Sequence, residues 1–226
     1  MSIAGITEDD IASYLANNPG FFERHAQLLA SVQLANPHGP RAVSLPERQI
    51  EMLRERIRRQ ETKMMEMIRH GQENMATSDR LNRWTRNVLL THDAARLAPV
   101  LLHDLQHQFM IPQAALRVWG VDEAYADLPC AQPCSEDVKI FTTSLVAPYC
   151  GLNSGFEAVG WCEMPDSVQS LAMIPLRADR THQAFGLMLL GSPDPTRYTT
   201  DMGTEFLAQV GDIAGAALTR LLPPAD

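Results

Sequence analysis

The spacing of apolar residues in the middle of the chain predicts one long helix. Apolar side chains recur there at intervals of three and four residues, at Ile50, Leu53, Ile57, Met64 and Met67, and again at Leu81 and Val88. Between Pro46 and Pro99 the sequence contains no further proline and a single glycine, Gly71. Because this heptad-like spacing is typical of coiled coils, we predict a long dimerisation helix over residues 44–92.

This helix has a start signal and needs a partner. Ser44, Pro46 and Glu47 form a capping signature, in which the serine accepts a hydrogen bond from a backbone N–H of the first turn. At 1.5 Å per residue the helix is about 65 Å long, too long for one small domain to cover. We therefore expect a homodimer whose interface is formed by Ile50, Leu53, Ile57, Met64 and Met67. Polar or small residues weaken the same seam: Gln60, Gly71, Asn74, Ser78 and Thr85.

Two short helices precede the long helix and form a helical head. The first is opened by Thr7, with Asp10 three residues later as its capping partner. The second begins at Asn18 and Pro19, an N-cap followed by proline at the first helical position, and continues to Val32. Turn-forming residues 36–40 then lead into the long helix. We assign residues 1–43 to the head and its linker.

After the long helix the pattern changes to a mixture of helices and strands. A helix is predicted over 96–109 and a strand over 114–120, followed by an irregular region. Two further strands, 170–176 and 184–190, are predicted to pair antiparallel, and an amphipathic helix over 203–222 closes the chain before Pro223. Residues 93–226 therefore form an α+β domain with a central antiparallel sheet flanked by helices.

The composition is that of a globular protein, and the charge argues against nucleic acid as a partner. The chain has 226 residues, of which 45% are hydrophobic and 20% charged, with a formal net charge of -8. Affinity for nucleic acid comes largely from Lys and Arg, whereas acids outnumber bases in residues 91–226. The arginines of the long helix alternate with glutamates, a pattern typical of a solvated coiled-coil flank. We expect no nucleic-acid partner.

No targeting or membrane segment is predicted. The first ten residues lack a basic region and include Glu8, Asp9 and Asp10, and no apolar run approaches the roughly 20 residues that span a bilayer. We therefore expect a cytoplasmic protein with no membrane association. In that compartment the four cysteines are expected to be reduced thiols: Cys130, Cys134, Cys150 and Cys162.

Several stretches resemble known families. The order of the predicted elements, with Ile174-Pro175-Leu176 and the run from Phe185 to Ser192, resembles the GAF domain, the antiparallel-sheet sensor module of phytochromes and cyclic-nucleotide phosphodiesterases. Four motifs are similar to the bacterial proteins grouped as domain of unknown function family 484: residues 18–22, 44–49, 148–151 and 202–207. The resemblance implies a GAF-like domain in a bacterial protein. That family has no established activity.

A ligand pocket is expected where the GAF-like fold leaves space, between the sheet and the irregular segment from Pro148 to Trp161. Its predicted lining residues are Trp119, Cys150, Phe156, Trp161 and Met173. Long irregular covers often carry binding function, and aromatic walls with few polar groups suit a small, largely apolar ligand. The same side chains could equally be core. The Asn-Lys-Phe-Asp-Glu signature of cyclic-nucleotide GAF domains is absent, and the sequence specifies no cofactor.

Metal binding and thiol chemistry are two further possibilities for the GAF-like domain. His103 and His107 have the i, i+4 spacing of two metal ligands, but no third ligand is evident, and neither cysteine pair has zinc-ribbon spacing, so we expect no metal site. One GAF lineage reduces free methionine sulfoxide with cysteines around its pocket. In that reading Cys150 is the nucleophile and Cys130 or Cys134 resolves the intermediate.

The sequence therefore favours a non-catalytic, dimeric sensory or adaptor protein. We expect this protein to bind a small, largely apolar ligand in the GAF-like domain. We also expect it to signal through an unidentified protein partner, because no output domain is visible in the sequence. Two alternatives remain open: a thiol-dependent redox enzyme, and a purely structural coiled-coil adaptor whose pocket is vestigial.

Overall fold

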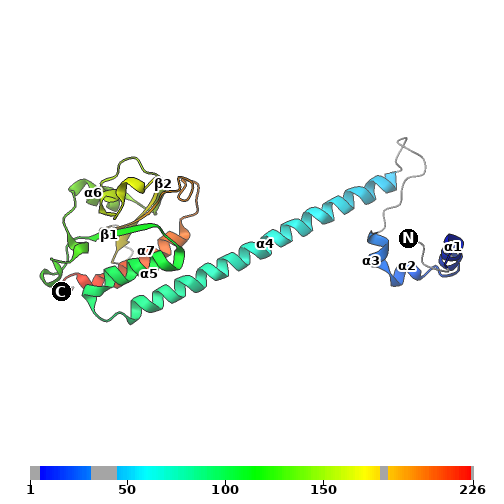
Figure 1. Ribbon diagram of the computed structural model, residues 1–226, viewed down its shortest axis with the longest axis horizontal. Helices are drawn as coiled ribbons and strands as arrows, with labels where there is room; N and C mark the ends of the chain where they lie inside the picture. Colours follow the sequence, from blue (N-terminus) through cyan, green and yellow to red (C-terminus); the bar gives the residue numbers. More distant parts are fainter. Residues whose placement is uncertain (1–5, 32–44, 179–182, 225–226) are drawn as a thin grey trace. The chain divides into compact units, whose positions relative to one another are not determined.

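The computed structural model describes residues 6–31, 45–178 and 183–224 (Figure 1). The chain divides into two units, Met1–Met64 and Met65–Asp226, and the boundary lies within the long helix α4 (Leu45–Leu90). The predicted N-cap Ser44, the linker 36–40 and Val32 lie outside the described residues.

The first helix of the head is capped as predicted. In α1 (Glu8–Asn17) the Thr7 hydroxyl oxygen accepts the Asp10 N–H at 3.2 Å, and the Asp10 carboxylate accepts the Thr7 N–H at 2.9 Å. Each side chain thus satisfies a backbone donor that the first turn of a helix leaves without a partner.

The second predicted helix is in fact two short ones, α2 (Phe21–Arg24) and α3 (Ala26–Ser31). The backbone leaves the helical region at His25, with φ -121° and ψ 47°. Gly20, rather than Asn18, is the N-cap of α2. The prediction failed at Asn18 because this residue ends α1 instead: its side-chain amide donates to the Tyr14 carbonyl at 2.9 Å.

The predicted long helix is confirmed, but the C-terminal part of its apolar seam is buried against other elements of the same chain. Leu81, Trp84 and Val88 are buried in one hydrophobic cluster with residues of α5 (Leu97–Phe109) and of the sheet. The seam predicted from sequence therefore does not continue to Leu81 and Val88 as a free surface. A three-and-four spacing marks a buried helix face without indicating which element covers it.

The sheet has four antiparallel strands in the order β1-β4-β3-β2. They are β1 (Gln113–Val118), β2 (Tyr149–Leu152), β3 (Ser170–Arg177) and β4 (Ala184–Ser192). The antiparallel pairing of β3 with β4 was predicted and is confirmed. Strand β2 was not predicted, because four residues are too few to show the alternation that identifies a strand.

Helices cover one face of the sheet, and a mixed segment covers the other (Figure 1). Helix α5 contacts β1, and α7 (Glu205–Leu218) contacts β3. At Gly211 in α7 an added Cβ would lie 2.7 Å from Ile174 Cγ2, so this helix needs glycine to approach the strand closely. The opposite face meets α6 (Glu136–Ser144) and the 3-10 segment Glu157–Trp161.

This arrangement confirms the α+β fold class, with N-terminal helices and a long helix ahead of an antiparallel sheet flanked by helices. Two hydrophobic clusters, one on each face of the sheet, form the core. No helix in the described parts of the chain is both long enough and apolar enough to cross a membrane.

Candidate functional site

A cavity of about 290 Å³ lies on the sheet face that carries α6. Its walls come from β3, β4, α6 and the start of the 3-10 segment. The lining residues are Asp137, Val138, Phe141, Phe156, Glu157, Ala158, Met173 and Leu187.

The floor of the cavity follows from strand alternation. Successive side chains of a strand point to opposite faces, and Met173 and Leu187 belong to the cluster on the α6 side, with Leu171 and Leu189. In the antiparallel register Met173 faces Leu189 and Leu187 faces Pro175. The floor is therefore apolar and is built from the two central strands.

The wall is aromatic and is placed by helix α6. Ser135 caps this helix, and its hydroxyl accepts the Val138 N–H at 3.3 Å. Asp137 and Phe141 are four residues apart and so lie on one helix face. The ring centroids of Phe141 and Phe156 are 5.9 Å apart, and those of Tyr149 and Phe156 are 5.6 Å apart.

Two carboxylates complete the lining. Glu157 accepts the backbone N–H of Ser135 at 3.1 Å and also the Ser135 hydroxyl. These hydrogen bonds, the hydroxyl first, lower the pKa of Glu157 below its ordinary value and keep it ionised at neutral pH. Asp137, in the first turn of α6, is exposed.

The predicted pocket residues fall into three groups. Phe156 and Met173 line the cavity. Trp119 and Trp161 pack in the same cluster beside it, and the Trp119 indole N–H donates to the Ala184 carbonyl at 3.0 Å. Cys150 is buried on the opposite face of the sheet, in the cluster that includes α5 and α7. It does not join the others because its neighbour Tyr149 occupies the α6 side.

Sequence reasoning did not identify the contribution of α6. Asp137, Val138 and Phe141 come from that helix, and the region was predicted to be irregular. A signal was present, since Ser135 is an N-cap residue followed by two acids of a first turn. Leu187, on a strand that was predicted, could not be linked to α6 without the fold.

The predicted dimer interface is an exposed apolar stripe on α4. Its five residues have exposed fractions between 49% and 73%: Ile50, Leu53, Ile57, Met64 and Met67. In a straight helix with 3.6 residues per turn the stripe continues through Ile68 and Met75, which are 52% and 71% exposed. The predicted seam did not include these two residues.

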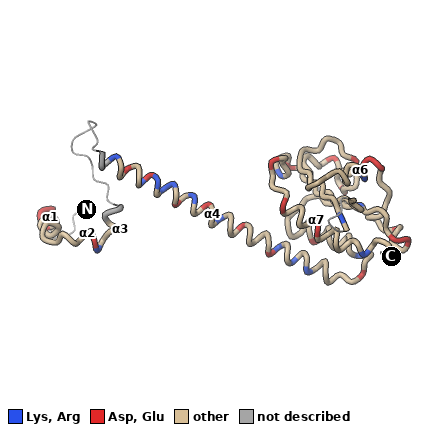
Figure 2. The backbone as a smooth tube through the Cα atoms, turned by 180° about the vertical axis from the view of Figure 1, so that it is seen from behind, with Lys and Arg blue, Asp and Glu red and all other residues tan. Residues whose placement is uncertain are grey.

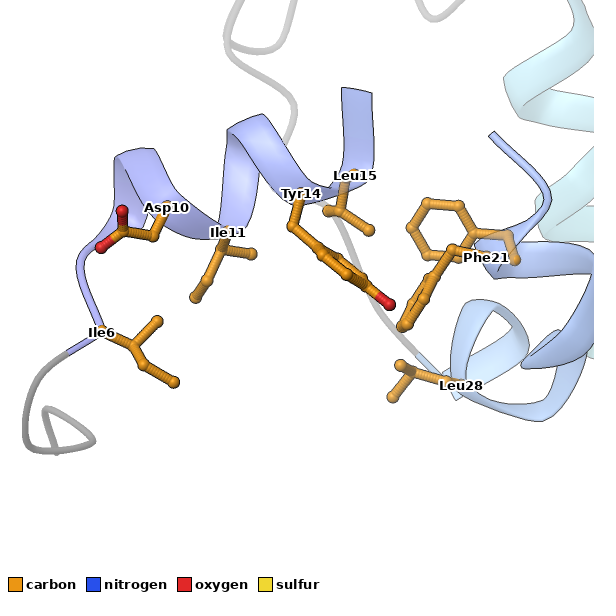
Figure 3. Close-up of a pocket in the computed structure, with 8 residues that line it drawn as sticks. Ile6, Asp10, Ile11, Tyr14, Leu15, Phe21 and Leu28 are labelled. Atoms are coloured by element: carbon orange, nitrogen blue, oxygen red, sulfur yellow. The ribbon is translucent and has the colours of Figure 1, made fainter. Parts of the chain in front are cut away.

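The head carries a second, larger hollow of about 650 Å³ (Figure 3). Tyr14 and Phe21 meet edge to face there, with ring centroids 5.9 Å apart, and Figure 3 shows the Tyr14 side chain directed toward Phe21 and Leu28. No residue of α1 or α2 is buried. The lining residues are Ile6, Asp10, Ile11, Tyr14, Leu15, Phe21, Phe22 and Leu28.

The four cysteines are free thiols with raised pKa values. Burial is the leading cause for each, and it raises the pKa of Cys162 to about 11. His103 and His107 are exposed on α5. Within residues 6–31, 45–178 and 183–224, no three His, Cys, Asp or Glu side chains are grouped as a metal site.

Comparison with known proteins gives one family match. The family described as "Protein of unknown function, DUF484" matches residues 1–223, as the sequence motifs predicted. No curated protein matches the chain.

Solved structures with a similar arrangement are GAF domains. One, from a protein assigned as a sensor histidine kinase of Pseudomonas syringae pv. tomato, is 14% identical, covers 68% of this chain and 92% of its own, and has a TM-score of 0.44. Two come from phosphoenolpyruvate-protein phosphotransferases. The Coxiella burnetii domain is 10% identical, covers 65% of this chain and 94% of its own, and has a TM-score of 0.44. The Acinetobacter domain is 10% identical, covers 66% of this chain and 96% of its own, and has a TM-score of 0.41.

Proposed function

We propose, for a chain that belongs to the DUF484 family of proteins of unknown function, the role of a non-catalytic, dimeric sensory protein. Its sheet domain (residues 93–226) binds a small, largely apolar ligand, its long helix dimerises, and a protein partner receives the signal. The observation that carries this proposal is the cavity between α6 and the central strands.

The cavity has the character of a small-molecule site. Ligand pockets typically measure about 300–1,000 Å³ and are mostly apolar and aromatic with a few polar groups. This one, at about 290 Å³, lies just below the lower limit of that range, so its ligand is small. The adaptor alternative, with a vestigial pocket, predicts a collapsed interior, and an open cavity favours the sensory role instead.

The exposed stripe on α4 supports dimerisation. Each of its apolar side chains is about half exposed or more, and burying apolar surface stabilises an association by about 25 cal/mol per Å². Pairing two copies along this stripe would remove all five predicted interface residues from water at once.

Charges along α4 support a protein partner rather than nucleic acid. Basic and acidic residues alternate along the helix (Figure 2). Arg48 pairs with Glu51, Arg69 with Glu73, and Arg59 with Glu55. We propose that the partner docks on the head, whose hollow is apolar and exposed.

The cysteines support a role without catalysis. A redox nucleophile needs a depressed thiol pKa and access to substrate, whereas burial raises the pKa of Cys150 and of its proposed resolvers, Cys130 and Cys134. Cys150 also lies on the face of the sheet opposite the cavity.

A thermal-shift screen of small aromatic and aliphatic compounds tests the proposal. A ligand present at a hundredfold excess over its Kd stabilises the protein by about 2.7 kcal/mol, which for a chain of this size raises Tm by roughly 5–10 °C. The shift should disappear in Ala158→Leu, which fills the cavity, and persist in Val146→Ser, a change at an exposed site outside it. Failure of every compound to raise Tm, or equal shifts in both variants, would contradict the proposal.

A further inference from the structure

We propose that the ligand of this cavity carries a positive charge, and that its class is a small aromatic or aliphatic amine. This inference rests on the proposed function, because it names the ligand class of the same cavity. It refines the expectation of a largely apolar guest by specifying the polar group.

The lining has negative charge and no positive charge. Asp137 enters from the first turn of α6 and Glu157 from the 3-10 segment, and both line the cavity together with apolar side chains. None of the described residues that line the cavity is a Lys, Arg or His. An anionic ligand would therefore meet like charge, and a neutral one would leave both carboxylates without an opposite charge.

Glu157 is held in place and in its charged form. Both donors that fix it come from Ser135, the residue that caps α6. One donor reaches each carboxylate oxygen, and an ionised carboxylate has about four lone-pair sites. Acceptor capacity thus remains on both oxygens for an ammonium group, which has only donors.

Two cations of the described chain in this region, Lys139 and Arg117, have other partners. Lys139 pairs with Glu136 at 2.6 Å. Arg117 donates to the Pro129 carbonyl at 3.0 Å, and its guanidinium lies 5.7 Å from the Trp161 ring centroid. Across the described residues neither Asp137 nor Glu157 forms an ion pair. The two carboxylates are therefore available to a cation from solution.

The aromatic wall favours the same charge. The faces of Phe and Tyr rings carry partial negative charge and attract cations. Phe141 and Phe156 line the cavity together with the carboxylates, and Tyr149 packs against Phe156. The apolar floor, with Met173 and Leu187, suits the hydrocarbon part of the ligand. A small amine matches both parts of the site.

Three probes with closely matched skeletons test the charge preference: 2-phenylethylammonium, 2-phenylethanol and phenylacetate. Each is titrated into the full chain by calorimetry, with NMR of the cavity residues to locate binding. We expect the ammonium to bind about fivefold to tenfold more tightly than the alcohol, and the carboxylate to bind most weakly. The preference should shrink between about 20 and 300 mM salt, because the carboxylates are exposed and screened.

Charge-neutralising variants give the residue-level test. Asp137→Asn and Glu157→Gln should each reduce the ratio of ammonium affinity to 2-phenylethanol affinity, measured in the same variant. Glu163→Gln, an exposed acid outside the cavity lining, is the matched control.

The outcomes separate this inference from the proposed function. Equal or tighter binding of the alcohol at the cavity overturns the amine class and leaves the ligand site standing. Ammonium binding that Ala158→Leu does not weaken places the amine elsewhere and overturns the inference. Absence of binding by all three probes at the cavity counts against both proposals, because the phenylethyl skeleton is of the small size that the cavity admits.

Discussion

The indole N–H of Trp84 in α4 donates to the backbone carbonyl of Leu101 in α5 at 3.0 Å, and both side chains are fully buried. Around this contact, the Asn87 amide donates to Asp104 at 2.8 Å and the Arg220 guanidinium donates to the Thr91 carbonyl at 3.0 Å. The last turns of the long helix are thus fixed to the helices of the sheet domain.

We expect Trp84→Ala to destabilise the protein by about 3–5 kcal/mol, since it leaves a large cavity in the core. Trp84→Phe keeps an aromatic ring but loses the hydrogen bond to the Leu101 carbonyl. We expect it to lower the free energy of unfolding by at least about 1 kcal/mol, but by less than Trp84→Ala does. Urea unfolding monitored by circular dichroism measures both. Arg86→Ala, an exposed change on the same helix, should stay within about 0.5 kcal/mol of the parent. A Trp84→Ala variant as stable as Arg86→Ala would contradict this account.

Ile57→Asp should abolish the dimer, because it places a charge in the centre of the exposed apolar stripe. Sedimentation velocity at micromolar concentration measures the change. Thr62→Asp is the matched control: five residues further along α4, it lies about 140° around the helix and is also exposed. We expect that variant to remain dimeric. The dimer proposal fails if the parent is a monomer, or if Ile57→Asp stays as dimeric and stable as the parent.

The head should contribute little to the stability of the chain. Tyr14 is 53% exposed, and no residue of α1 or α2 is buried. We therefore expect Tyr14→Ala to change the free energy of unfolding by no more than about 0.5 kcal/mol, measured in the same urea series as the Trp84 variants. A loss of several kcal/mol would mean that the hollow of the head is already covered in the free protein, and it would remove the proposed docking surface.

The elements predicted well from sequence are those with long, repeated patterns. The long helix shows a three-and-four spacing over many turns, and β3 and β4 are apolar runs bounded by turn residues. The burial of Leu81 and Val88 in the core of their own chain was not predictable, because the same spacing is expected for a dimer seam and for an intrachain core. Strand β2 and helix α6 were missed, since each gives only a brief local signal.

The candidate site was predictable only in part. Phe156 and Met173 were identified because they lie on the cover and on a predicted strand, respectively. The side of the sheet taken by Cys150 depends on the register of β2, in which Tyr149 pairs with Met173 and Cys150 with Ala172. A shift of one residue would exchange the two faces, and the sequence around β2 does not define that register.

The chain should not reduce free methionine sulfoxide. Thiolate attack requires a low pKa at an accessible sulfur, and burial raises the pKa of Cys150, the expected nucleophile of the redox alternative. A coupled assay with a thiol reductant should give the same rate for the parent and for Cys150→Ser. Turnover by the parent that vanishes in Cys150→Ser would instead establish the redox function.

Stability should fall at alkaline pH, and Cys162 should account for part of the fall. Burial raises the pKa of this thiol from 9.0 to about 11. Between these values the unfolded chain loses the proton while the folded chain keeps it, so the unfolded state binds fewer protons and the free energy of unfolding decreases as pH rises. The slope from this one group is at most about 1.4 kcal/mol per pH unit. Cys162→Ala removes that contribution, so its stability should fall less steeply than that of the parent between pH 9 and 10.5 in urea unfolding. Cys134→Ala, at a half-buried site, should follow the parent more closely, and parallel curves for the parent and Cys162→Ala would refute the assignment.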